Sequence, residues 1–158
     1  ADAIQEIDSA NAAVYKNNAE NYIKQLKKLD AEYAKAAANA KNKTLLFGDR
    51  FPFRYLVDDY GLKYYAAFVG CSAETEASFK TIRFLADKVD ELNLSTVLII
   101  EKSDKKIART IIENSKSKNQ QILEMDSLQS ITIKEIKKGR TYLSAMQNNL
   151  EVLKKALN

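Results

Sequence analysis

Histidine is absent from this 158-residue chain, and cysteine occurs only once. Without histidine the chain cannot contain a Ser-His or Cys-His catalytic arrangement, and no imidazole of its own can bind a metal ion. A single cysteine cannot form a disulfide within the chain, so the cysteine count leaves the redox compartment open. Any metal ligand in this sequence must therefore be something other than imidazole.

Long apolar runs and clustered charges of one sign are also missing. No run approaches the roughly 20 residues that a helix needs to span a bilayer, and the amino end lacks the apolar core of a signal peptide. The net charge is only +4, and lysines and arginines are scattered among acidic residues, which does not indicate a nucleic-acid surface. The composition is 46% hydrophobic and 29% charged, as expected for one compact globular domain.

The segment 44–76 predicts a strand, a helix, a second strand and then a polar loop that opens another helix. Proline suits the first turn of the helix, where its missing N–H is not needed, and glycine is typical of a helix end. The expected features are a strand Thr44–Phe47 ended by residues 48–50, a helix from Pro52 to Gly61, and a strand Tyr64–Phe68.

The rest of the chain continues the alternation of helices and strands. The uninterrupted β-branched run before Glu101 is typical of a buried parallel strand. The expected elements are a helix Glu76–Leu92, a strand Ser95–Ile100, a helix capped by Ser103 or Asp104, a strand Gln121–Met125, a capping box at Thr132 and Glu135, and a last helix Thr141–Leu157. Four strands alternating with helices predict an α/β fold with a four-stranded parallel sheet flanked by helices.

A long amphipathic helix is expected before this sheet. Apolar residues from Tyr15 to Ala40 recur at near-heptad spacing on one stripe. We expect the stripe to pack lengthwise on its own domain; a coiled coil or a partner-docking helix is the alternative, although alanines in the seam disfavour a strong zipper. The sequence thus divides into a helix over residues 1–43 and an α/β lobe over residues 44–158.

Chemically distinctive side chains follow the four expected strands, at the edge where ligands bind in an open α/β sheet. They are Asp49 with Arg50, Cys71, Glu101 and Asp126. A thiolate beside oxygen ligands suits zinc, whereas carboxylates alone suit manganese or calcium. We expect Arg50 to pair with Asp49 or Glu101 and orient it.

A second interpretation needs no metal. Cys71 lies in a loop that opens a helix, and a helix amino end favours the thiolate form of cysteine. The chain would then be a flavodoxin-like, thiol-dependent enzyme that uses Cys71.

Several motifs in a fixed order resemble one known family. GDRFPFRYLVDDYGLKYYAAF, GCSAETEASFKTI, VLIIE and LEMDSLQS are similar to the carboxy-terminal lobe of the zinc/manganese-type solute-binding proteins of bacterial ABC transporters (cluster A-I, the adhesin/zinc-uptake receptors). The long first helix resembles the backbone helix that joins their two lobes. The resemblance covers essentially the whole chain.

This resemblance implies a receptor function without catalysis. It implies a divalent metal cargo, zinc or alternatively manganese, held between two lobes and delivered to a membrane permease outside the cytoplasm. Asp126 would be a ligand, Cys71 would replace the family's His or Glu, and Asp49 or Arg50 would stand where many members have His. The chain would then be half of a receptor, with the amino-terminal lobe absent and about two of four ligands missing.

Overall fold

The sheet is built from four parallel strands in the order β2-β1-β3-β4, in a computed structural model that describes residues 1–68 and 77–158. The strands are β1 (Thr44–Arg50), β2 (Lys63–Phe68), β3 (Thr96–Ile100) and β4 (Gln121–Met125). The helices are α1 (Asp2–Ile7), α2 (Ala12–Ala38), α3 (Arg54–Asp59), α4 (Phe79–Glu91), α5 (Lys106–Asn114), α6 (Ile133–Lys137) and α7 (Tyr142–Ala156), with a 3₁₀ turn at Ser9–Asn11. The predicted α/β fold with a four-stranded parallel sheet is confirmed.

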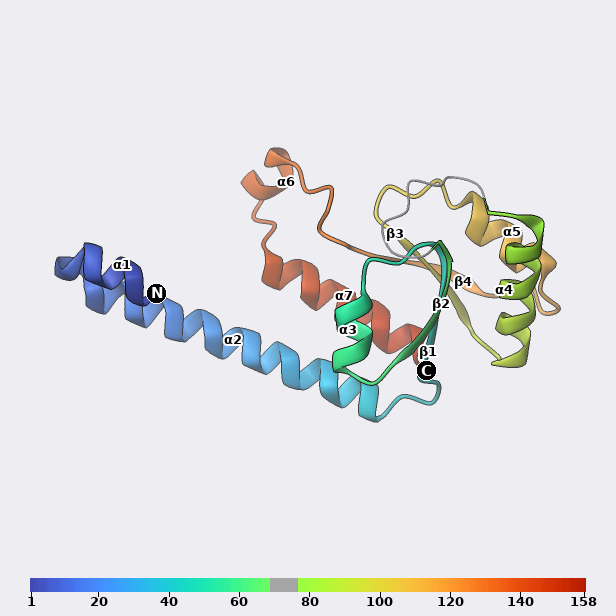
Figure 1. Cartoon of the computed structure of the whole chain (residues 1–158), viewed down its shortest axis with the longest axis horizontal. Coiled ribbons are helices and arrows are strands. Elements are labelled where there is room, and N and C mark those ends of the chain that lie inside the picture. The colour runs from blue at the N-terminus through green and yellow to red at the C-terminus, as the bar shows by residue number, and fades with distance from the viewer. Residues whose placement is uncertain (69–76) are drawn as a thin grey trace.

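Helices cover both faces of the sheet because successive side chains of a strand point in opposite directions (Figure 1). Leu45 and Phe47 of β1 pack in a core with α2, α3 and α7, whereas Leu46 packs with α4 and α5. In β3, Leu98 and Val97 divide between the two cores in the same way. Strands buried on both faces explain why their sequences are continuous apolar runs.

The first strand is longer than expected. Residues 48–50 were predicted to end it, but β1 continues to Arg50, with a register shift against β2 between Phe47 and Arg50. The reason is tertiary packing at Gly48: a Cβ there would lie 2.6 Å from the Ala108 Cα atom. Gly48 thus allows α5 to approach the strand closely, so this glycine belongs to the sheet instead of terminating it.

The long helix packs on the lobe over only part of its length, so the expectation of lengthwise packing is wrong for its amino-terminal half. Leu29, Tyr33 and Ala37 are buried in the core, whereas Tyr22 is 42% exposed. Figure 1 shows α2 projecting away from the sheet, with α1 folded back along its outer end. Although α2 has 27 residues, no helix in the described part of the chain is apolar enough to cross a membrane.

Smaller shifts affect the helix starts. The expected start of the third helix, Glu76, lies outside the described residues; within them, α4 begins at Phe79 and is capped by the Ser78 side chain. The helix expected from Pro52 begins at Arg54. The capping box at Thr132 and Glu135 is confirmed at the start of α6.

Candidate functional site

The carboxyl ends of β3 and β4 lie side by side, because Ile100 pairs with Met125 in the parallel register. Glu101 and Asp126 directly follow these two residues and therefore occupy neighbouring positions on one edge of the sheet. Two of the predicted site residues are thus brought to adjacent strand ends.

Glu101 is bound to the loop that follows β4. Its carboxylate accepts hydrogen bonds from the Ser127 backbone N–H at 2.7 Å, from the Ser127 hydroxyl at 2.6 Å and from the Ser130 hydroxyl at 3.2 Å. Burial by itself would raise the pKa of Glu101, but these hydrogen bonds outweigh it and hold the pKa below its ordinary value. The Glu101 carboxylate is therefore negatively charged, and its hydrogen bonds hold residues 127–130 in place.

Asp126 is held by both its main chain and its carboxylate. The buried Asn149 of α7 accepts the Asp126 N–H and donates to the Asp126 carbonyl, each at 2.8 Å. The carboxylate Oδ1 accepts the Leu128 N–H at 2.9 Å, and Oδ2 forms an ion pair with the Arg140 guanidinium. The main chain of Asp126 is thus fixed, and its carboxylate has one nearby backbone partner and one charged partner from a distant residue.

Arg140 connects Asp126 to helix α6. One guanidinium nitrogen binds Asp126, and the other binds the Glu135 carboxylate at 2.7 Å. The Arg140 backbone N–H also bonds the Glu135 carbonyl, after the chain turns at Gly139 with φ +89°. The bond to Asp126 is the main reason that the pKa of Arg140 is raised. The three side chains therefore form one ion-pair network across residues 126–140.

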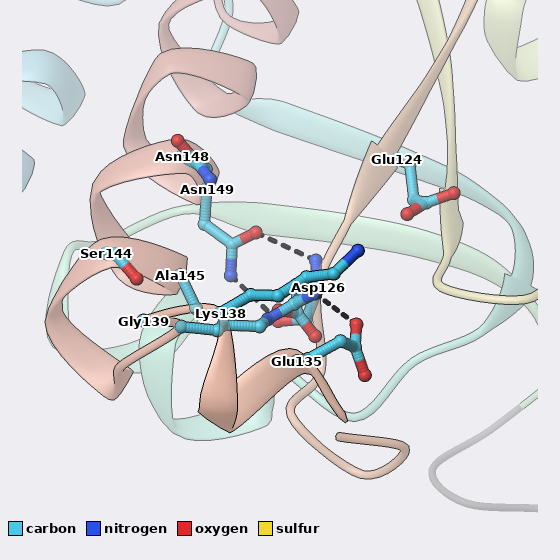
Figure 2. Close-up of a pocket in the computed structure, with 10 residues that line it drawn as sticks. Glu124, Asp126, Glu135, Lys138, Gly139, Ser144, Ala145, Asn148 and Asn149 are labelled. Carbon is cyan, nitrogen blue, oxygen red and sulfur yellow. Dashed lines mark hydrogen bonds and ion pairs between the residues drawn. The ribbon is translucent and has the colours of Figure 1, made fainter. Parts of the chain in front are cut away.

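A pocket of about 500 Å³ opens beside this network (Figure 2). Its wall is formed by the end of β4, the exit of α6 and the first turns of α7. The lining residues are Glu124, Asp126, Glu135, Lys138, Gly139, Arg140, Ser144, Ala145, Asn148 and Asn149. The dashed lines in Figure 2 show Asn149 bonded to the main chain of Asp126. The candidate ligand Asp126 thus lines a cavity, while Asn149 holds its main chain in place.

Asp49 takes a different position from the one predicted. It lies within β1 instead of beyond it, is half-buried, and accepts the Arg50 backbone N–H at 2.8 Å. The expected side-chain pairing of Arg50 with Asp49 or Glu101 is wrong, because within residues 1–68 and 77–158 Arg50 takes part in no ion pair. The arginine that pairs with a strand-end carboxylate is Arg140.

Cys71, the predicted thiol ligand, lies outside the described residues. Among the residues that the structure does describe, no three Cys, Asp or Glu side chains are grouped closely enough to hold a metal ion. The described part of the candidate site therefore consists of the neighbouring Glu101 and Asp126, with Asp49 in the adjacent strand β1.

Two residues that position Asp126 were not predicted from the sequence. Asn149 carried a usable signal, since it is a polar residue that precedes Leu150 on the buried face of the last helix. Arg140 carried none, because nothing in its local pattern distinguishes it from the other cations of this lysine-rich segment. Its role depends on a contact made 14 residues away from Asp126.

The sequence matches one protein family over nearly its whole length. The family described as "Zinc-uptake complex component A periplasmic" matches residues 1–156. A curated relative, the zinc-binding protein AdcA of Streptococcus pyogenes, is 30% identical over 153 residues, which is 97% of this chain but 29% of AdcA. The chain thus spans less than a third of the length of this relative.

Solved structures show the same fold. The metal-dependent lipoprotein YcdH from Bacillus subtilis matches 98% of this chain with a TM-score of 0.80 and 28% identity, and the match covers 57% of that protein. The Zn(II)-bound ZnuA-like domain of Streptococcus pneumoniae AdcA matches 99% of the chain with a TM-score of 0.75 and 28% identity, again over 57% of its own length. The described α/β lobe with its long first helix therefore has the fold of the matched parts of these two proteins.

Proposed function

This chain belongs to the zinc-uptake complex component A family, and on that premise we propose that it is a metal-receiving lobe of an extracytoplasmic receptor. The receptor captures a divalent metal ion and delivers it to an ABC permease in the membrane. Zinc is the proposed cargo, because the AdcA relative is named a zinc-binding protein and the matched AdcA domain is described as Zn(II)-bound. Manganese is the alternative, and the Irving–Williams order favours zinc at a comparable site.

The observation that carries this proposal is the position of Asp126. It follows β4 at the carboxyl edge of a parallel sheet, where ligands bind in such folds, and it faces the pocket of about 500 Å³. A carboxylate oxygen is an accepted zinc ligand. Asp126 is therefore the first proposed ligand, with Glu101, Asp49 and Cys71 as the further proposed ligands.

The family's members are receptors that bind a substrate, not enzymes. The matched family and the AdcA relative are named for zinc uptake and zinc binding, not for the thiol-dependent reaction of the second interpretation of Cys71. We propose that the chain catalyses no reaction and has no nucleic-acid partner. Its proposed organisation is a backbone helix over residues 1–43 and a lobe over residues 44–158, which is half of a two-lobed receptor.

Zinc affinity of ligand variants tests the proposal. In competition with a chromogenic zinc chelator, Asp126→Asn and Cys71→Ser should each weaken zinc binding by about tenfold or more, because even the loss of a residue that only orients a ligand costs about 10–100-fold in metal affinity. Asp87→Asn, on the exposed face of α4, is the matched control and should bind as the unaltered chain does. If both ligand variants bind zinc as tightly as this control, the assignment is overturned.

A further inference from the structure

We propose that Arg140 is a displaceable counter-ion of Asp126, which occupies this carboxylate before the metal does and thereby lowers its metal affinity. This inference rests on the proposed function, because it concerns the same carboxylate. It adds a residue that tunes affinity without being a ligand.

Both oxygens of the Asp126 carboxylate have protein partners. Oδ1 accepts the Leu128 N–H within the same loop, and Oδ2 is paired with Arg140. The Asp126 side chain is only 11% exposed, so little water reaches the carboxylate to replace either partner. A metal ion that binds Asp126 at Oδ2 therefore competes with Arg140 for that oxygen.

Arg140 is the partner that can move. The Asp126 main chain is fixed on both sides by Asn149, whereas the Arg140 side chain is 33% exposed and reaches Asp126 from beyond Gly139. Its second guanidinium nitrogen remains bonded to Glu135 at 2.7 Å. Arg140 can therefore leave Asp126 while Glu135 and water satisfy its charge.

The electrostatic consequence has a definite sign. A guanidinium beside a carboxylate withdraws electron density from it through charge-assisted hydrogen bonds. It also repels a divalent cation that approaches the same oxygen, and because the site is partly buried, solvent screens this repulsion only weakly. Removing the positive charge should increase zinc affinity, although it removes an interaction that stabilises the metal-free protein. A residue with a purely structural role would not produce opposite changes in these two quantities.

Charge and shape are separated by two substitutions of Arg140. Arg140→Gln keeps a hydrogen-bond donor but removes the charge. We expect this variant to bind zinc about tenfold more tightly, a gain of about 1.4 kcal/mol. Its metal-free form should unfold at a lower temperature than that of the unaltered chain. Arg140→Lys keeps the charge and should bind zinc as the unaltered chain does. Arg83→Gln removes an exposed arginine of α4 and controls for net charge.

Glu135→Gln provides an independent arm, because glutamine can keep the capping box of α6 while removing the negative charge that shares the Arg140 guanidinium with Asp126. This variant should bind zinc more weakly. In the Asp126→Asn background, Arg140→Gln should leave zinc affinity unchanged, since the carboxylate on which it acts is gone.

The outcomes separate this inference from the function on which it rests. If Asp126→Asn does not weaken zinc binding, the metal assignment fails and the role of Arg140 falls with it. If Asp126→Asn weakens binding but Arg140→Gln does not strengthen it, or strengthens it equally in the Asp126→Asn background, the counter-ion inference alone is overturned. If Arg140→Gln does not fold, a Glu135→Gln affinity equal to or above that of the unaltered chain overturns it.

Discussion

The Asn149 side chain holds the main chain of Asp126 on both sides. Its Oδ1 accepts the Asp126 N–H and its Nδ2 donates to the Asp126 carbonyl, each at 2.8 Å, and Asn149 is only 2% exposed. Asp126 follows the last residue of β4, where the ladder with β3 has ended. Asn149 therefore continues the hydrogen bonding of the strand by one residue and links helix α7 to the candidate site.

Replacing this asparagine should be costly. Asn149→Ala removes two hydrogen bonds and leaves a partly buried backbone donor and acceptor of Asp126 without their partner, which we expect to lower the free energy of unfolding by about 1–3 kcal/mol. Urea denaturation measures this loss. Asn148→Ala, at the exposed neighbouring position, is the matched control and should change stability by less than about 0.5 kcal/mol. Equal effects at both positions would show that the clamp contributes nothing specific.

The junction between the long helix and the lobe depends on Tyr33. This buried residue stacks on Tyr60 with ring centroids 5.3 Å apart, and its hydroxyl donates to the Met146 carbonyl at 2.7 Å. Tyr33→Phe keeps the ring but leaves the Met146 carbonyl without this donor, so unfolding should become easier by about 1–2 kcal/mol.

Tyr22→Phe is the control for this substitution, since Tyr22 is 42% exposed on the projecting part of the same helix. Thermal unfolding of both variants measures the effect, and Tyr22→Phe should be nearly neutral. A Tyr33→Phe variant as stable as Tyr22→Phe would contradict the assigned role of the hydroxyl group.

The sequence predicted the buried strands well because local pattern and tertiary environment agree there. The fully buried strand β3 differs by one residue from the expected strand Ser95–Ile100. The edge strand β4, in which only Met125 is buried, also coincides with the expected strand Gln121–Met125. Continuous apolar runs are unambiguous when both faces of a sheet are covered. The same reasoning placed Glu101 and Asp126 at neighbouring strand ends.

What the sequence could not predict depends on contacts between distant residues. The stripe on α2 predicts an apolar face but not what covers it, so the exposed position of Tyr22 was missed. Similarly, no local pattern specifies that Arg140 reaches Asp126, or that Gly48 lies against Ala108. Each of these features is fixed by packing between elements, not by the periodicity within one element.

Because α5 approaches β1 closely at Gly48, we expect substitution of this glycine to destabilise the protein. A Cβ added there would lie 2.6 Å from the Ala108 Cα and 2.9 Å from its backbone nitrogen. Gly48→Ala should therefore force α5 away from the sheet and destabilise the fold by about 1–3 kcal/mol. Combining it with Ala108→Gly should not restore stability in a denaturation measurement, because the helix backbone that causes the clash remains. Full rescue by Ala108→Gly would mean that only the two side chains collide.

Glu101 predicts a pH-dependent contribution to stability. Because the hydrogen bonds of Ser127 and Ser130 hold the pKa of the folded-state carboxyl below its ordinary value of 4.5, the ionised form is favoured by folding. The resulting stabilisation is complete above about pH 4.5 and is lost as the pH falls through the lowered pKa of the folded state. Glu101→Gln should be less stable than the unaltered chain at pH 7 by about 1–2 kcal/mol.

This difference should shrink as the pH falls below about 4.5 and nearly vanish when the carboxyl of the folded protein is protonated. Urea denaturation of both proteins at a series of pH values measures the effect. Glu113→Gln, at an exposed position on α5, should give a curve close to that of the unaltered chain. A stability difference for Glu101→Gln that stays constant down to the most acidic pH would show that hydrogen-bond geometry, not ionisation, accounts for the role of Glu101 in holding the loop beside Asp126.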